Sequence, residues 1–96
     1  MSLFVVQHVH EAEKCPAGDP EMGPMLLKIV SDQNAANYGV TIKNEAVLDG
    51  RHTLYLTVEA ESEGKIKEFM APFLHMGTVE IWPASRCEQV VERKEC

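Results

Sequence analysis

Residues 40–59, VTIKNEAVLDGRHTLYLTVE, carry the strongest structural signal in the chain. Two runs rich in β-branched and aromatic residues, 40–48 and 52–59, flank the pair Asp49-Gly50, which is typical of a hairpin turn. The second run alternates cleanly, so its apolar residues share one face of the strand. The segment therefore predicts an antiparallel hairpin with one buried face.

The length of the turn determines which side chains of the two strands share a face. A two-residue turn would place Lys43 and Glu45 beside the leucines of the second strand. A three-residue loop would instead place Ile42, Ala46 and Leu48 there. We expect the three-residue loop, because it puts apolar residues on the buried face.

The segments on either side of the hairpin complete a β-α-β-β-α-β order. From hydrophobic periodicity the other expected elements are a strand at 3–9, a helix at 24–38, a helix at 61–76, a strand at 78–82 and a short C-terminal helix after 85. Pro72 should kink the second helix, Pro83 should stop the last strand, and Ser31-Asp32 should interrupt or restart the first helix. This order predicts an α+β, ferredoxin-like fold: a four-stranded antiparallel sheet with two helices on one face.

Length and composition restrict the class of protein. A chain of 96 residues forms one domain, 1–96, and its 45% hydrophobic and 25% charged residues are ordinary for a globular protein. Fifteen acidic residues against nine basic ones give a net charge of −6, which argues against a nucleic-acid partner. The apolar run at the start ends at Gln7, too short for a signal peptide or a membrane span. We therefore expect a soluble, cytoplasmic protein without a membrane partner.

The face of the sheet opposite the helices needs a cover, because the strand at 3–9 is apolar on both sides. That face would carry Tyr55, Glu80 and Trp82, and a second copy of the chain is the simplest cover. In this respect the sequence resembles the dimeric α+β barrel group, which includes haem-degrading and quinol monooxygenases. The resemblance covers most of the chain and implies a homodimer. It is architectural only, since none of the catalytic signatures of those families occurs.

Four short segments carry a second resemblance. They are His8-Val9-His10, Cys15-Pro16-Ala17-Gly18, His52-Thr53-Leu54-Tyr55 and Val79-Glu80-Ile81-Trp82-Pro83. Their layout is similar to that of small uncharacterised prokaryotic proteins, and this likeness implies no function.

The predicted topology brings His8, His10, Cys15, His52 and His75 to one end of the domain. Strand alternation places His8 and His10 on the same face. Two such imidazoles, with a third ligand from Cys15, His52 or His75, would bind Zn(II), Fe(II) or Cu and leave one coordination position open for a small-molecule ligand. The alternative is that His8 and His10 are buried hydrogen-bonding residues at the end of a strand.

The three cysteines do not form a recognisable motif. Cys15, Cys87 and Cys96 are an odd number without a Cys-x-x-Cys pair, which favours free thiols, with a Cys87–Cys96 redox link as the alternative.

Two other functions stay open. Tyr55, Glu80 and Trp82 could line a ligand pocket of a cofactor-free oxygenase or isomerase, with Glu80 as the base. Alternatively, Tyr55 and Trp82 anchor the interface of a structural or regulatory dimer that has no chemistry.

Overall fold

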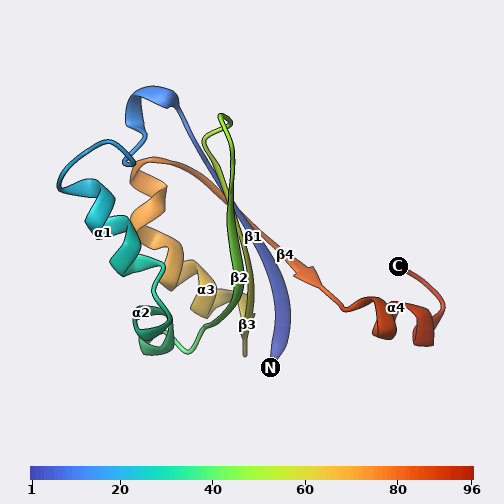
Figure 1. Ribbon diagram of the computed structural model, residues 1–96. Coiled ribbons are helices and arrows are strands. Elements are labelled where there is room, and N and C mark those ends of the chain that lie inside the picture. The colour runs from blue at the N-terminus through green and yellow to red at the C-terminus, as the bar shows by residue number, and fades with distance from the viewer.

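The computed structural model describes residues 1–96 as a four-stranded antiparallel sheet with helices against one face (Figure 1). In chain order the elements are β1 (Ser2–His10), η1 (Ala12–Lys14), α1 (Met22–Ile29), α2 (Asp32–Asn37), β2 (Thr41–Leu48), β3 (Thr53–Ala60), α3 (Glu63–Met70), η2 (Ala71–His75), β4 (Gly77–Ala84) and α4 (Cys87–Arg93). The strands lie in the order β2-β3-β1-β4. The α+β class and the ferredoxin-like order of the strands are therefore confirmed.

The core lies between the sheet and the helices. Every second residue of β1 and β3 is buried on this face, as the period of two along a strand requires. Phe4, Val6 and His8 of β1 pair with Val58, Leu56 and Leu54 of β3. Helix α3 and the following turn η2 cover these side chains with Ile66, Phe69, Met70 and Phe73. His8 is thus placed in a row of otherwise apolar side chains.

The helices are interrupted near the residues that the sequence predicts. The Ser31 hydroxyl accepts a hydrogen bond from the Asn34 amide at 3.2 Å, so Ser31 caps a new helix, α2. Gly39, with φ of 74°, provides the left-handed residue that ends this segment. Helix α3 ends at Met70, and the chain continues through Pro72 as the 3-10 helix η2. The expected kink is therefore a change of helix type, because Pro72 has no amide hydrogen to continue the α-helix.

Two expectations about the strands were wrong. Strand β4 does not stop at Pro83, which lies opposite Phe4, and it continues to Ala84. A proline is tolerated there because β4 is an edge strand. In the hairpin, Leu48 lies opposite Thr53 and Ala46 opposite Tyr55, so four residues, 49–52, form the loop instead of three.

A bulge in β2 explains why only part of the expected register holds. Ala46 and Leu48 lie on the sheet face opposite the helices, contrary to the prediction. The register shifts between Ile42 and Asn44, and this shift returns Ile42 to the core face opposite Val58. The placement of Ile42 is therefore as expected, although the loop is longer.

The C-terminal helix α4 extends beyond the end of the sheet (Figure 1). None of its residues is buried, and the side chain of Val91 is 73% exposed. No helix of the protein combines the length and the apolar character that crossing a bilayer requires.

Candidate metal centre

The site lies where β1 ends and the β2–β3 hairpin turns. His10 is the last residue of β1, and His52 is the last residue of the loop before β3. The amide of His10 donates to the carbonyl of His52 at 3.1 Å, which ties the two segments together. His52 has φ of 50°, a left-handed conformation that costs a residue with a Cβ atom some strain. The hairpin and this bond thus hold the His52 ring 5.3 Å from that of His10.

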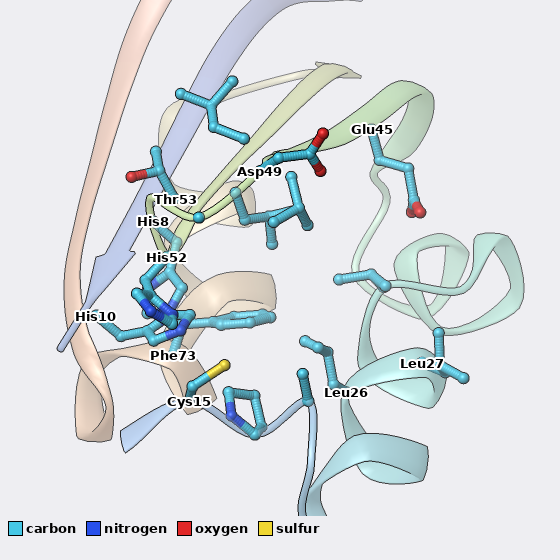
Figure 2. A pocket seen from close by; sticks show the side chains of 17 residues that line it. His8, His10, Cys15, Leu26, Leu27, Glu45, Asp49, His52, Thr53 and Phe73 are labelled. Carbon is cyan, nitrogen blue, oxygen red and sulfur yellow. The ribbon is translucent and has the colours of Figure 1, made fainter. Parts of the chain in front are cut away.

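Cys15 comes to the same place from the loop after β1. Its amide closes the 3-10 turn η1 by donating to the Ala12 carbonyl at 3.2 Å. Its backbone is extended, at φ −64° and ψ 123°, as is usual for a residue before proline. Pro16 itself is buried and anchors the loop against the domain. In Figure 2 Cys15 lies just below the labelled histidines, and its sulfur projects into the space below the Phe73 ring.

His10, Cys15 and His52 lie close enough together to hold a metal ion. One possible ligand atom from each residue lies within 4.8 Å of the other two. Bonds of about 2.0–2.1 Å to nitrogen and 2.3 Å to sulfur would place tetrahedral ligand atoms about 3.3–3.7 Å apart. The widest separation must therefore shorten by about 1 Å around an ion of that geometry. Cys15 lies on a loop, so it is the ligand best placed to move.

His8 lies behind His10 and is almost completely buried, with 2% of its surface exposed. Its ring packs on Phe73 with a centroid distance of 4.8 Å. Its Nδ1 atom lies 3.1 Å from the carbonyl oxygen of Thr78. A carbonyl oxygen only accepts hydrogen bonds, so Nδ1 of His8 carries a hydrogen and donates.

The hydrogen bond from His8 to Thr78 also determines which ring nitrogen of His10 carries the hydrogen. Burial lowers the pKa of both imidazoles, each assisted by a neighbouring histidine, while the Thr78 carbonyl partly opposes the shift in His8. In neutral His8, with Nδ1 protonated, Nε2 is an acceptor. The Nδ1 atom of His10 lies 3.3 Å from it and donates its hydrogen there. The lone pair of His10 is therefore on Nε2.

The Nε2 atom of His10 is buried and has no hydrogen-bond partner. Buried polar atoms almost always have a partner, and an unpaired acceptor lowers stability. Here the unpaired atom belongs to a residue beside a second imidazole and a thiol. Its free lone pair is the form of histidine that binds a metal.

Gly77 allows β4 to begin directly beside the site. It pairs with His10, and a Cβ atom on it would overlap the carbonyl oxygen of Val9 and lie 2.9 Å from the Cα atom of His10. A side chain at this position would force β1 and β4 apart. The hydrogen bond from His8 to Thr78, the next residue of β4, depends on the same close approach.

A cavity of about 330 Å³ adjoins the three candidate ligands. Its lining is mostly apolar and comes from the loop after β1, from α1, from the hairpin and from η2. Figure 2 shows the histidines and Cys15 on one side of this cavity and Leu26 and Leu27 of α1 on the other.

The other residues singled out in the sequence lie elsewhere. His75 is exposed on η2 and is not in the three-residue group. Tyr55 and Glu80 both lie opposite Gln7, and Trp82 opposite Val5, on the sheet face without helices. The Tyr55 hydroxyl donates to the Gln7 side chain at 2.5 Å. Cys87 and Cys96 are free and exposed.

Three contributors to the site have no signal of their own in the sequence. The Thr78 carbonyl is a backbone group, Phe73 follows the pattern of a core helix residue, and Gly77 has the sequence context of a helix terminator. Only the pairing of β1 with β4 brings them to the histidines. The chain matches no protein-family model and no curated protein.

Proposed function

We propose that this protein binds a transition metal through His10, Cys15 and His52 and presents an open coordination position to a small ligand. His8 is not a ligand in this proposal. It acts as a positioning residue that holds the His10 ring and its hydrogen.

The unpaired Nε2 atom of His10 is the observation that carries the proposal. A lone pair that is buried without a partner is unfavourable, and a bound cation would remove that cost. The chain from the Thr78 carbonyl through His8 to His10 resembles the outer contacts that orient metal-binding histidines. An ordinary buried histidine at the end of a strand would need a partner on both nitrogens.

Two imidazoles and one thiolate suit Zn(II), Fe(II) or copper. Three protein ligands leave a fourth position open, which is the arrangement of catalytic and sensor sites more than of structural ones. A metal held there would act as a Lewis acid on a ligand at that position. The site also requires a reduced Cys15, which fits the cytoplasm.

Metal content after loading with Zn(II), Fe(II) or Cu under reducing conditions tests this proposal. We expect one ion per chain in the wild type, and a loss of that ion in both His10→Ala and Cys15→Ser. His75→Ala is the matched control, because it removes an exposed histidine at the same end of the molecule. Equal metal content in His10→Ala, Cys15→Ser and the wild type would overturn the proposal. Cys15→Ser alters only a loop residue, so it remains informative if His10→Ala fails to fold.

We propose further that a second copy covers the sheet face without helices. Trp82 is 42% exposed on this face, and Leu48 is also exposed there, beside the half-buried Val5 and Val9. Tyr55 and Glu80 lie on the same face, so any pocket that they form with Trp82 would be enclosed only between two sheets. The projecting helix α4, which has no buried residue, would also find a partner surface in such a dimer.

A further inference from the structure

The walls of the cavity beside the candidate ligands are mostly apolar. Leu26 and Leu27 of α1, with Val30 directly after this helix, form one wall, and Val47 of the hairpin forms part of another. Leu54 and Phe73 come from the core side. Besides the candidate ligands, the buried polar residues that line this space are Thr53 and His8.

The charged groups of the cavity lie away from the candidate ligands. Glu45 and Asp49 are exposed residues of the hairpin, and Figure 2 shows their carboxylates on the far side from His10 and Cys15. No lysine is among the lining residues, and neither is an arginine. Because two carboxylates and no cationic lysine or arginine line the cavity, a negatively charged ligand would be repelled there.

We infer that the cavity holds a small, uncharged, apolar molecule that carries a single nitrogen, oxygen or sulfur donor, and that this donor takes the open position of the metal. The inference rests on the proposed metal site. The apolar walls would bind the body of the molecule, and the metal would bind its head. Such a division between apolar walls and a few convergent polar groups is usual in ligand sites.

The size of the cavity limits the ligand. A space of about 330 Å³ holds about ten water-sized atoms at roughly 30 Å³ each. One six-membered ring with a short donor group fits this limit, whereas a nucleotide or a haem does not. The ligand class is therefore a compound of about ten or eleven non-hydrogen atoms, either one six-membered ring with a small donor group or a short branched aliphatic chain.

Two probes with the same donor separate the contribution of the apolar walls from that of the metal. Imidazole provides only the donor nitrogen, and 4-phenylimidazole adds an uncharged ring. Protein loaded with Co(II) reports on both through the visible absorption of the metal. We expect 4-phenylimidazole to change this spectrum and to bind at least about tenfold more tightly than imidazole, because the ring buries apolar surface.

A matched pair of variants on α1 tests the place of binding. Leu27 lines the cavity and is 70% exposed, so Leu27→Glu adds a charge to the wall without disturbing the core. Met25 is 53% exposed on the same helix and does not line the cavity, so Met25→Glu is the control. We expect Leu27→Glu to remove most of the preference for 4-phenylimidazole and to leave imidazole binding unchanged, while Met25→Glu changes neither.

The outcomes distinguish this inference from the metal proposal. If the chain takes up neither cobalt nor any of Zn(II), Fe(II) and Cu, the proposed function fails. If cobalt binds but the two probes have equal affinity, or if Leu27→Glu and Met25→Glu behave alike, the apolar ligand class is wrong and the metal site stands. Equal binding of 4-phenylimidazole with and without cobalt would contradict the proposed contact with the metal.

Discussion

The Nδ1 atom of His10 lies 3.3 Å from the Nε2 atom of His8, whose own Nδ1 donates to the carbonyl oxygen of Thr78 at 3.1 Å. The direction of this chain of hydrogen bonds is set at its inner end by a backbone group. No side-chain substitution at Thr78 removes that acceptor. The free lone pair of His10 is therefore determined by the pairing of β1 with β4, before any ion binds.

Substitutions of His8 should weaken metal binding although His8 is not one of the proposed ligands. His8→Leu removes the acceptor for His10 and should lower metal affinity by about 10–100-fold, the usual effect of losing such an outer contact. His8→Gln keeps an oxygen able to accept from His10 and should give an intermediate affinity. Competition titrations with a chromophoric chelator measure both. Affinities equal to the wild type in both variants would show that His8 has only a packing role.

The metal-free protein should lose stability as the pH falls through 6.5. Burial lowers the pKa of His8 from its ordinary value of 6.5, so below that pH the unfolded chain takes up a proton that the folded chain does not. The free energy of unfolding should fall with decreasing pH, with a limit of about 1.4 kcal/mol per pH unit for one proton, and should stay constant above pH 7.5 for this group.

Urea unfolding at pH 7.5, 6.5 and 5.5 measures this dependence. His8→Leu should reduce the dependence to the part that comes from His10, whose pKa burial also lowers, and His75→Leu, which alters an exposed histidine, should leave the dependence as it is. A wild type and a His8→Leu variant with the same pH slope would rule out His8 as its origin.

Gly77→Ala should damage both the fold and the site. The added Cβ atom has no room against Val9 and His10, and we expect a loss of about 1–3 kcal/mol in the free energy of unfolding. Metal affinity should fall as well, because β1 and β4 must separate beside His10. Gly18→Ala is the control, since a Cβ atom at Gly18 meets nothing within 4 Å. Thermal and urea unfolding measure the stability of both variants, and metal titration measures their affinity. Equal stability and equal affinity in Gly77→Ala and Gly18→Ala would refute the role of close packing at Gly77.

His52→Asn should separate the conformational role of this position from its chemical role. Asparagine tolerates the left-handed backbone of residue 52 better than most residues do, so the hairpin should persist. It lacks the imidazole, and metal affinity should therefore fall further than in His8→Leu. Arg51→Ala, in the same loop, should leave the affinity unchanged. Circular dichroism and metal titration give the two readouts, and an unchanged affinity in His52→Asn would exclude His52 as a ligand.

Trp82→Glu should shift the proposed dimer toward the monomer. It places a charge on the sheet face without helices, at a large exposed aromatic residue, and we expect the dissociation constant to rise by at least about tenfold. Leu74→Glu introduces the same charge at an exposed apolar residue on the helix side, and the mass should not change. Sedimentation velocity compares the three proteins. A wild type that sediments as a single 10.7 kDa chain would remove the dimer proposal.

The order of the elements could be predicted from the sequence because each element has its own periodicity. The alternation of β3 and the helical spacing of α3 are local properties, and the fold follows from their order. The register of the hairpin could not be predicted, because the bulge near Lys43 compensates for a longer loop. A bulge at a polar residue of an exposed strand, here between Ile42 and Asn44, leaves the hydrophobic pattern ambiguous.

The candidate site could be predicted only as a set of residues at one end of the sheet. Strand alternation correctly places His8 and His10 on one face, but it does not determine which face; in the structure it is the helix-covered one. Their different environments could not be predicted, because His8 meets the Thr78 carbonyl and His10 meets His52 only through long-range pairing. Cys15 depends on the path of an irregular loop, which has no periodicity to follow.

Both borders of the sheet carry features that oppose the addition of further strands. β2 is interrupted by its bulge and bears Lys43 there, and β4 carries Pro83, which has no amide hydrogen to offer a neighbour. Growth of the sheet into a continuous ribbon of many copies is therefore disfavoured at either border. The proposed dimer would therefore stay a closed pair, which would protect a chain with an exposed tryptophan from fibrillar aggregation.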